Sequence, residues 1–521
     1  MLAAELLLAL LVVVAVLVTI SRRIRVPYPV LLLLGGLVVG LVPGIPRLEL
    51  DPEIVFLVVL PPILYVSAFL TPIRDFRANL KNISALAIGL VAASAGVVAV
   101  IAMALVPGMS WPLAAALGAI VSPPDAVAAT AIAQRLAVPR RVISILEGES
   151  LLNDATALTI YRAAIGAAAA AATVSVVGSL GSFVFVAVGG ILIGLVVGWI
   201  TSWVRAHLTD TPVEITVSLI TPYAAYLPAE VLGVSGVLAA VTAGLFLGRR
   251  SSQIMGSEAR LAGRAVWESL VFLLTGVVFL AIGFQISTIS RAIDRTTLLQ
   301  LATVGVVVSL ALIAVRAIWV FGLSVRELLA KDQRRIRVME SIVLSWAGMR
   351  GVVSLAAALA IPISLPGNAL PARDAIIIIT FTVILVTLVG QGLTLPLVIR
   401  AVGLGGGDGD DGHEESHARQ ELIEEALRRI DDLEKKWPDH KPLIDQLRTS
   451  YQHRAEHEEQ LNEAPGNEAE QELVEHRQIR SDVIDAQRDA LAAMRDRGAI
   501  DDDVLRNIER ELDLEEIRME A

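Results

Sequence analysis

The chain has 521 residues and is 55% hydrophobic, more apolar than is usual for a soluble globular protein, and its formal net charge is −10. Cysteine is absent, which excludes disulfides and thiolate metal sites. Residues 401–521 carry 34 acids and 16 bases, whereas residues 1–400 carry 19 acids and 27 bases, so we expect an acidic tail after a basic membrane domain and no nucleic-acid partner.

Long apolar runs fill the first 400 residues. Runs of about 17–25 residues can cross the hydrocarbon core of a bilayer as helices. The first run is not expected to be a cleavable signal peptide, because it lacks a basic start and contains Glu5. Thirteen spans are predicted, near residues 2–20, 28–43, 53–70, 83–106, 112–134, 142–162, 179–204, 213–228, 234–248, 264–286, 297–323, 338–361 and 374–400.

Basic residues follow the odd-numbered spans. Loops rich in Lys and Arg generally face the cytoplasm. The pattern therefore predicts an N-terminus outside the cell and a cytoplasmic C-terminal tail. Examples are Arg22, Arg74, Arg135, Arg249 and Arg326.

Two spans are expected to be broken helices. The fifth contains Pro123 and Pro124 at mid-length, and the twelfth contains Gly348 and Gly351 on either side of a charge. If spans four to six and eleven to thirteen are inverted copies, both breaks hold the middle position of their copy. Matching breaks of this kind indicate the binding site of a secondary transporter. The alternative is two ordinary packing kinks.

Four ionisable residues lie inside these apolar spans: Asp125, Glu149, Asp154 and Arg350. Each charge in hydrocarbon costs at least about 2.5–3.5 kcal/mol, so such residues usually mark an ion or proton pathway. At a rise of 1.5 Å per residue, Asp125, Asp154 and Arg350 lie roughly 18–20 Å from the start of their spans. The core is about 30 Å thick, so these three residues can meet near its middle.

The sixth span places oxygen-bearing side chains on adjacent helix faces. Ser150 and Asp154 share one face, and Glu149 and Asn153 share the next. Oxygen ligands suit Na+, so Asp125 and Asp154 are the predicted direct ligands, with Ser150 and freed backbone carbonyls completing the shell. Asn153 belongs to this site as a ligand, or as a side chain that orients Glu149 or the broken backbone.

Arg350 is the predicted partner of Glu149, because an unpaired buried guanidinium would be very costly. This ion pair would hold the twelfth span against the sixth. A static network of all four charges is the alternative reading, but no second base lies at the depth of Asp125 and Asp154. Arg316 in the eleventh span is assigned no role.

Four segments carry a family resemblance: Leu60–Leu64, Ser122–Ala129, Glu147–Asp154 and Gly348–Gly351. With them the chain resembles a bacterial sodium–proton antiporter of the cation:proton antiporter-1 family, which is related to the animal sodium–hydrogen exchangers. The resemblance covers the whole membrane part, in family order.

The resemblance implies an all-α polytopic homodimer in the bacterial plasma membrane, with a moving core, a dimer-forming scaffold and no cofactor. It implies that Asp154 binds cation and proton in turn, helped by Asp125 and Ser150. The glutamate–arginine pair of the family falls on Glu149 and Arg350. An Asn153–Asp154 pair is typical of the branch that exchanges one cation for one proton.

The membrane domain is expected to cover residues 1–402. Residues 403–416 read as a Gly/Asp-rich linker, since no EF-hand spacing supports a calcium loop. Residues 417–521 read as an acidic helical tail. Six of the seven histidines lie in this tail, either as sensors of cytoplasmic pH or on solvated helix faces.

The predicted function is exchange of Na+, or Li+, for H+ by alternating access. A K+/H+ antiporter would use the same residues, and a cation channel is a weaker alternative because no carbonyl-filter motif is present. An enzyme is not expected, because HExxH, GxSxG and Walker motifs are all missing.

Overall fold

The computed structural model describes residues 2–24, 26–42, 52–170, 176–292, 294–329, 334–361, 364–365, 368–369, 372–404, 411–463, 467–497, 499 and 502–520. The chain divides into two compact units, Met1–Gly407 and Asp408–Ala521. The domain limits predicted above stay a prediction. Residues 405–410 of the expected linker lie outside the described residues, and its residues 411–416 are helical.

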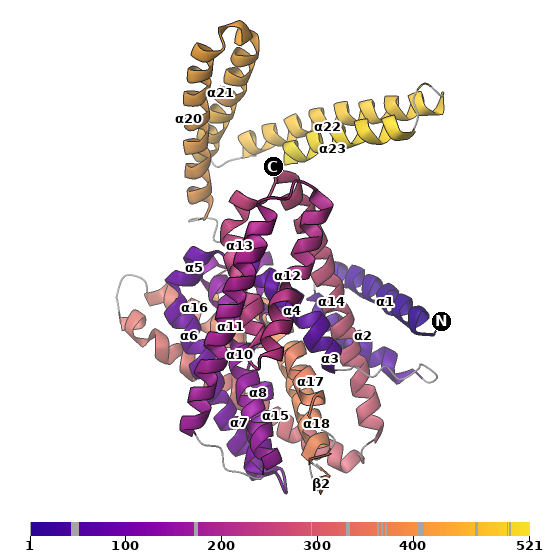
Figure 1. Ribbon diagram of the computed structural model, residues 1–521, viewed down its shortest axis with the longest axis vertical. Coiled ribbons are helices and arrows are strands. Elements are labelled where there is room, and N and C mark those ends of the chain that lie inside the picture. Colours follow the sequence, from indigo (N-terminus) through magenta and orange to yellow (C-terminus); the bar gives the residue numbers. More distant parts are fainter. Residues whose placement is uncertain are drawn as a thin grey trace. The chain divides into compact units, whose positions relative to one another are not determined.

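The first unit is built from helices, as predicted (Figure 1). A short antiparallel pair, β1 (Ser364–Leu365) with β2 (Asn368–Ala369), is the sheet structure among its described residues. The helices are α1 (Leu2–Ile24), α2 (Tyr28–Leu41), α3 (Pro52–Ile54), α4 (Leu60–Leu70), α5 (Ile73–Ala78), α6 (Leu80–Ser84), α7 (Val91–Leu105), α8 (Trp111–Val121), α9 (Ala126–Arg135), α10 (Arg140–Ala170), α11 (Val176–Arg205), α12 (Thr211–Val231), α13 (Gly236–Ile254), α14 (Ser257–Ala292), α15 (Arg295–Leu329), α16 (Arg334–Trp346), α17 (Val352–Leu359), α18 (Ala372–Leu385) and α19 (Gly392–Val402).

Three of the predicted spans continue through π-helical turns. These turns are Val55–Val59 between α3 and α4, Ala85–Leu90 between α6 and α7, and Val386–Gln391 between α18 and α19. The two predicted breaks are confirmed: Ser122–Asp125 separates α8 from α9, and Ala347–Gly351 separates α16 from α17. Both breaks fall where proline or glycine removes or weakens helical hydrogen bonding.

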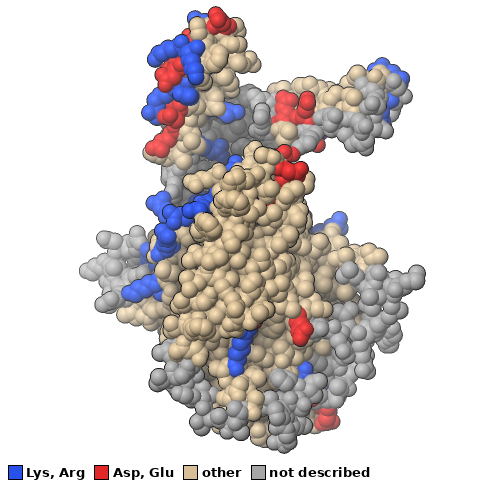
Figure 2. Space-filling view, viewed as in Figure 1, with Lys and Arg blue, Asp and Glu red and all other residues tan. Residues whose placement is uncertain are grey.

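Every predicted span coincides with a helix or with a broken or bent helix. By length and composition alone, seven stretches of the described chain could cross a membrane: Pro52–Leu70, Leu80–Leu105, Trp111–Arg135, Gly181–Arg205, Ser257–Gln285, Arg295–Val325 and Ala372–Val402. Helix α10, which carries several polar and charged side chains, is not among them. The number of thirteen and the orientation therefore stay predictions. Few charged side chains cover the middle of the face of this unit seen in Figure 2.

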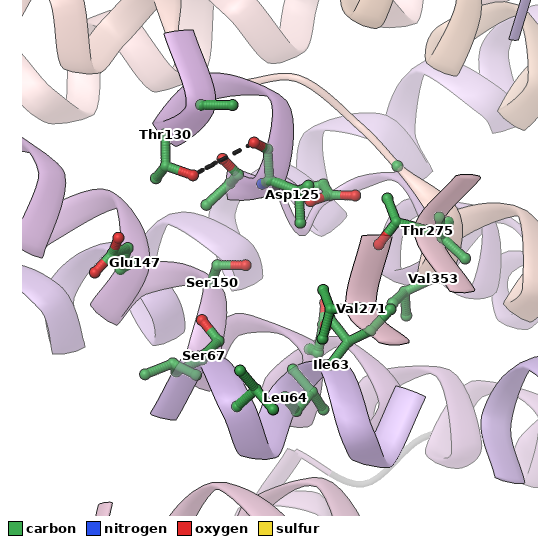
Figure 3. A pocket seen from close by; sticks show the side chains of 18 of the residues that line it. Ile63, Leu64, Ser67, Asp125, Thr130, Glu147, Ser150, Val271, Thr275 and Val353 are labelled. Atoms are coloured by element: carbon green, nitrogen blue, oxygen red, sulfur yellow. Dashed lines mark hydrogen bonds between the residues drawn. The ribbon is translucent and has the colours of Figure 1, made fainter. Parts of the chain in front are cut away.

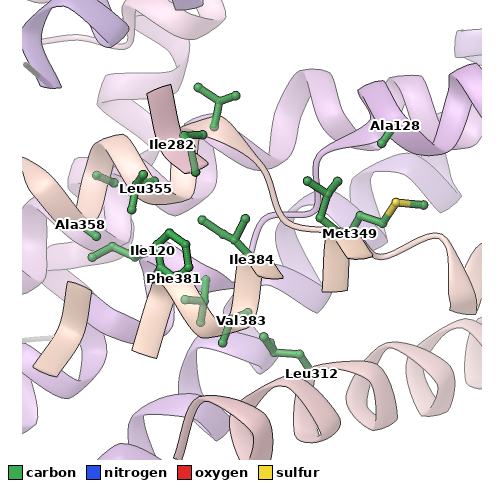
Figure 4. Close-up of a cluster of buried hydrophobic side chains, with 14 of the residues drawn as sticks. Ile120, Ala128, Ile282, Leu312, Met349, Leu355, Ala358, Phe381, Val383 and Ile384 are labelled. Carbon is green, nitrogen blue, oxygen red and sulfur yellow. The ribbon is translucent and has the colours of Figure 1, made fainter. Parts of the chain in front are cut away.

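Close helix contacts and apolar packing fix the half-helices. Helices α2 and α14 approach so closely that a Cβ on Gly36 or Gly283 would overlap the opposite backbone. Around the breaks, buried side chains from α8, α17 and α18 form one apolar cluster (Figure 4). Ile120, Leu355 and Phe381 belong to it. This apolar packing of the flanking helices holds both broken segments in position.

The second unit contains two helical hairpins, α20 (Asp411–Lys436) with α21 (Lys441–Glu463), and α22 (Asn467–Asp496) with α23 (Asp502–Glu520). In each hairpin, one arginine donates hydrogen bonds to two carboxylates of the opposite helix. Arg448 pairs with Asp431 and Glu434, and Arg488 pairs with Asp513 and Glu516. The hydrogen bond from Arg448 holds the pKa of Glu434 below its ordinary value.

The tail histidines whose side chains are described are exposed, at positions 417, 440 and 453. The side chains of His413, His457 and His476 lie outside the described residues. A role in pH sensing stays a prediction.

Candidate functional site

The two breaks meet at the centre of the candidate site. The backbone N–H of Asp125 donates a hydrogen bond of 2.7 Å to the carbonyl of Met349. A Cβ on Gly351 would overlap the Asp125 carboxylate. The segment Ala347–Gly351 can therefore pass this close to Asp125 only because residue 351 is a glycine. The two extended segments therefore cross in direct contact.

The Asp125 side chain lies at the start of two half-helices. Its Oδ1 accepts the Val127 N–H at 2.9 Å, which makes Asp125 the N-cap of α9. The backbone N–H of Val352, the first residue of α17, also faces this carboxylate. Both helix dipoles place their positive ends here, which favours a negative charge on Asp125.

Asn153 ties α10 to the first break. Its side chain is fully buried, and Nδ2 donates a hydrogen bond of 2.6 Å to the carbonyl of Pro124. Its Oδ1 has no hydrogen-bond partner among the described residues. This geometry matches the alternative in which Asn153 orients the broken backbone. A role as a direct ligand stays a prediction.

A cavity of about 720 Å³ brings the predicted ligands together (Figure 3). Asp125, Ser150 and Asp154 all line it, and Asp154 is 7% exposed and lies near enough to Asp125 for their charges to interact. The cavity extends to Asp75 and Arg140, which lie at the end of the bundle with the basic loops. In Figure 3, Ser150 and Asp125 border the same open space.

The predicted ion pair between Glu149 and Arg350 is not formed. Glu149 instead accepts two hydrogen bonds from Arg316, with Oε1–Nη1 at 2.6 Å and Oε2–Nη2 at 2.8 Å. Both side chains are 1% exposed, and Arg316 Nε also donates to the carbonyl of Leu344 at 2.8 Å. The bidentate pair joins α10 to α15.

Arg350 donates hydrogen bonds to backbone carbonyls where the two broken segments cross. Its Nε donates to Val121 O and its Nη1 to Gly348 O, both at 2.7 Å, and its backbone N–H donates to the hydroxyl of Thr387 at 3.1 Å. Val121 is the last residue of α8, where unpaired carbonyls and the helix dipole favour a positive charge. The guanidinium is thus paired with backbone rather than with a carboxylate.

The pairing of Arg316 with Glu149 was not predicted from the sequence, although the depth of Arg316 in its span indicates it. Arg316 lies seven residues before the end of its predicted span, and Glu149 seven residues after the start of its own. At 1.5 Å per residue, both lie roughly 10 Å from the same predicted membrane face, whereas Arg350 lies roughly 18 Å in. Depth therefore favours Arg316 as the partner of Glu149.

Comparisons with known proteins agree with this architecture. The family model described as "Sodium/hydrogen exchanger, transmembrane" matches residues 9–401. An uncharacterised Na+/H+ exchanger of Mycobacterium tuberculosis is 37% identical over 98% of this chain and 95% of its own length. The Na+/H+ antiporter ApNhaP of Aphanothece halophytica is 35% identical over 80% of this chain and 77% of its own. The structure of the sodium proton antiporter MjNhaP1 of Methanocaldococcus jannaschii shares the fold, with a TM-score of 0.63, 23% identity, and coverage of 78% of this chain and 99% of that one.

Proposed function

The chain belongs to the sodium/hydrogen exchanger family and is a membrane transporter, not an enzyme, and we propose that it exchanges one Na+ for one H+ at Asp154 and Asp125. Ser150 contributes a hydroxyl ligand, and Asn153 holds the broken backbone in position. We further propose that Li+ is accepted at the same site. A homodimer in the plasma membrane completes the proposal.

The observation that carries this proposal is the charge balance at the crossing. Glu149 and Arg316 neutralise each other, and the charges that remain on the two breaks and on this part of α10 are the carboxylates of Asp125 and Asp154 and the guanidinium of Arg350, which donates to backbone carbonyls of the crossing. One negative charge remains when both carboxylates are ionised. Uncompensated charge away from water is costly, so the site is neutral with one monovalent cation or one proton, and charged with neither or both.

This balance supports competition as the mechanism of coupling. A proton that binds the carboxylates cancels the charge that attracts Na+, and a bound Na+ does the same to the proton. Because the two carboxylates interact, they titrate as a pair. In the cycle, the neutral loaded site crosses between the two faces of the membrane as the core moves against the scaffold.

The same balance disfavours a divalent cation, which would leave the site with one positive charge. Potassium differs from sodium in size and not in charge, so K+/H+ exchange remains the alternative that these residues would also serve. A channel would need no such competition between cation and proton.

The test uses full-length protein in sealed liposomes with a pH-sensitive dye. Addition of Na+ should release protons from the wild type, and the rate should not change when a membrane potential is imposed with valinomycin and K+. Asp154→Asn should abolish this release while the protein still inserts and elutes as a monodisperse species. Asp374→Asn, which alters a carboxylate that is 70% exposed and does not line the Asp125–Asp154 cavity, is the matched control and should exchange normally.

Retained exchange in Asp154→Asn would reject the proposed site. Exchange that depends on membrane potential would reject the one-to-one stoichiometry. Proton release by K+ as fast as by Na+ would favour the alternative cation.

A further inference from the structure

A second buried polar cluster lies where α4, α11 and α12 meet, and the proposed transport cycle does not use it. Arg205, the last residue of α11, has a side chain that is 1% exposed. Its Nη2 lies 3.5 Å from Oε1 of Glu214, which is also buried, near the start of α12. Tyr65 of α4 is 1% exposed and lies close enough to interact with Arg205.

This cluster has more donors than acceptors. Among the described residues, Nε and Nη1 of Arg205, the hydroxyl of Tyr65 and Oε1 of Glu214 have no hydrogen-bond partner. Arginine stays charged in proteins, so its donors cannot be removed by loss of a proton. The contact with Glu214 occupies one nitrogen, at a distance longer than a good charge-assisted hydrogen bond. Oε1 of Glu214 cannot satisfy all five N–H groups of Arg205, so the guanidinium has donors to spare for a further acceptor.

Arg205 and Tyr65 line a cavity of about 260 Å³. Three arginines, Arg205 with Arg260 and Arg264 from α14, and one acid, Glu268, line it. Arg260 uses Nη1 to donate to the carbonyls of Ser252 and Met255, and Arg264 pairs with the exposed carboxylate of Glu268. Guanidinium groups that line one cavity suit phosphate oxygens, which accept several hydrogen bonds at once.

The remaining wall of this cavity is apolar. Phe69, Leu70, Ile215 and Trp267 contribute to it, and Leu261 at its rim is 60% exposed. A pocket with a basic floor and an apolar wall fits a phosphate group that carries an acyl chain better than it fits a bare inorganic ion. The cavity also lies at the basic ends of α11 and α14, the predicted cytoplasmic side, where anionic lipids are attracted to basic residues.

We propose that this cavity, which we call the arginine pocket, binds a phosphate group, either the headgroup of an anionic phospholipid or a free phosphate. Arg205 is the buried anchor, whose orphan Nε and Nη1 donate to the phosphate oxygens. Arg260 and Arg264 hold the same group from the rim. Arg205 and Arg260 do not line the Asp125–Asp154 cavity, although Val66, Leu70 and Arg264 line both cavities. The proposal does not depend on the proposed transport cycle.

The test measures ligand-induced thermal stabilisation of full-length protein in dodecyl maltoside. Four probes are titrated in parallel: dioleoylphosphatidylglycerol, dioleoylglycerol (which lacks the phosphate), glycerol 3-phosphate and inorganic phosphate. The variants are Arg205→Gln, Arg260→Ala and, as matched control, Arg249→Ala, which removes an exposed arginine at the end of α13 that does not line this pocket.

We expect saturable stabilisation by phosphatidylglycerol and none by dioleoylglycerol. Loss of one charge-assisted contact should weaken the apparent affinity about tenfold in Arg205→Gln and Arg260→Ala and leave it unchanged in Arg249→Ala. If Arg205→Gln does not fold, Arg260→Ala against Arg249→Ala decides the question.

Saturable stabilisation by glycerol 3-phosphate or inorganic phosphate with the same dependence on Arg260 would support the pocket and assign it to a free phosphate. Stabilisation by phosphatidylglycerol alone would assign it to a lipid headgroup. The proposal is overturned if no phosphate-bearing probe stabilises the protein, if dioleoylglycerol acts equally, or if Arg249→Ala weakens binding as much as Arg260→Ala.

Discussion

The ion pair between Glu149 and Arg316 should dominate the electrostatic stability of the transport core. Arg316→Met removes the guanidinium and keeps an apolar side chain of similar length. Both oxygens of Glu149 then lose their donors, at 2.6 and 2.8 Å, while the carboxylate stays 1% exposed. Removing one partner of such a buried pair costs about 3–5 kcal/mol.

A double-mutant cycle tests whether Arg316 or Arg350 is the partner of Glu149. Glu149→Gln alone leaves Arg316 buried without a carboxylate partner. It should lower the free energy of unfolding by a similar amount, about 3–5 kcal/mol. The double variant leaves no unpaired charge, so its loss should be smaller than the sum of the single losses by at least about 2 kcal/mol. In the parallel cycle with Arg350→Met, the coupling should stay below about 1 kcal/mol, because Arg350 donates to the carbonyls of Val121 and Gly348.

The assay is unfolding in mixed micelles of dodecyl maltoside and dodecyl sulfate, followed by circular dichroism. Ile318→Ala on α15 is a control for general damage to this helix, because Ile318 is 74% exposed and should lose little on truncation. A coupling with Arg350 larger than that with Arg316, or purely additive losses in the Arg316 cycle, would refute the reasoning.

Three further predictions follow from the crossing and the tail. Gly351→Ala should slow Na+-driven proton release about tenfold or more, because its Cβ would displace the Asp125 carboxylate, whereas Gly390→Ala, which faces open space, should exchange at the wild-type rate in the same liposome assay. Glu434 has a lowered pKa in the folded tail, so its contribution to the α20–α21 hairpin is present above pH 4.5 and is lost as the pH falls further. Amide hydrogen exchange across the hairpin, corrected for the intrinsic rate, should then rise with acidification, and less so in Arg448→Ala. Deletion of residues 405–521 should leave exchange intact, and loss of exchange in a well-folded deletion variant would make the tail part of the transport machinery.

The breaks could be predicted from sequence because their causes are local. Pro123 and Pro124 lack N–H groups, and this effect acts within one turn of helix regardless of what packs outside. The meeting of Asp125 with α10 could also be predicted, since depth along each span follows from counting residues. Local chemistry and depth together account for the position of the site.

The pairing of charges could not be predicted with the same success. Depth fixes one coordinate of a side chain, but its direction depends on how each helix is rotated, and this is set by contacts between helices. Arg350 lies in extended chain, so a helical face cannot be assigned to it, and it turns toward carbonyls of its own crossing. Arg205 at the end of its span would ordinarily be expected to reach toward water, and only the packing of Tyr65 and Glu214 against it shows that it is buried.

The contacts of the crossing also bear on cation choice. The carbonyls of Val121, Pro124, Gly348 and Met349 already accept hydrogen bonds from Arg350, Asn153 and Asp125, so the break offers fewer free backbone ligands than its length suggests. We infer that the cation is held mainly by carboxylate and hydroxyl oxygens with water, in a cavity too wide to fit one ion closely. Selection by charge is then strong, and selection by size is weak, because close rings of carbonyls are what other sites use to measure ion radius. On this reasoning Li+ and Na+ exchange at similar rates, K+ follows within about tenfold, and Ca2+ does not exchange. Rejection of K+ by more than about 100-fold would require rigid ligands that this crossing does not supply.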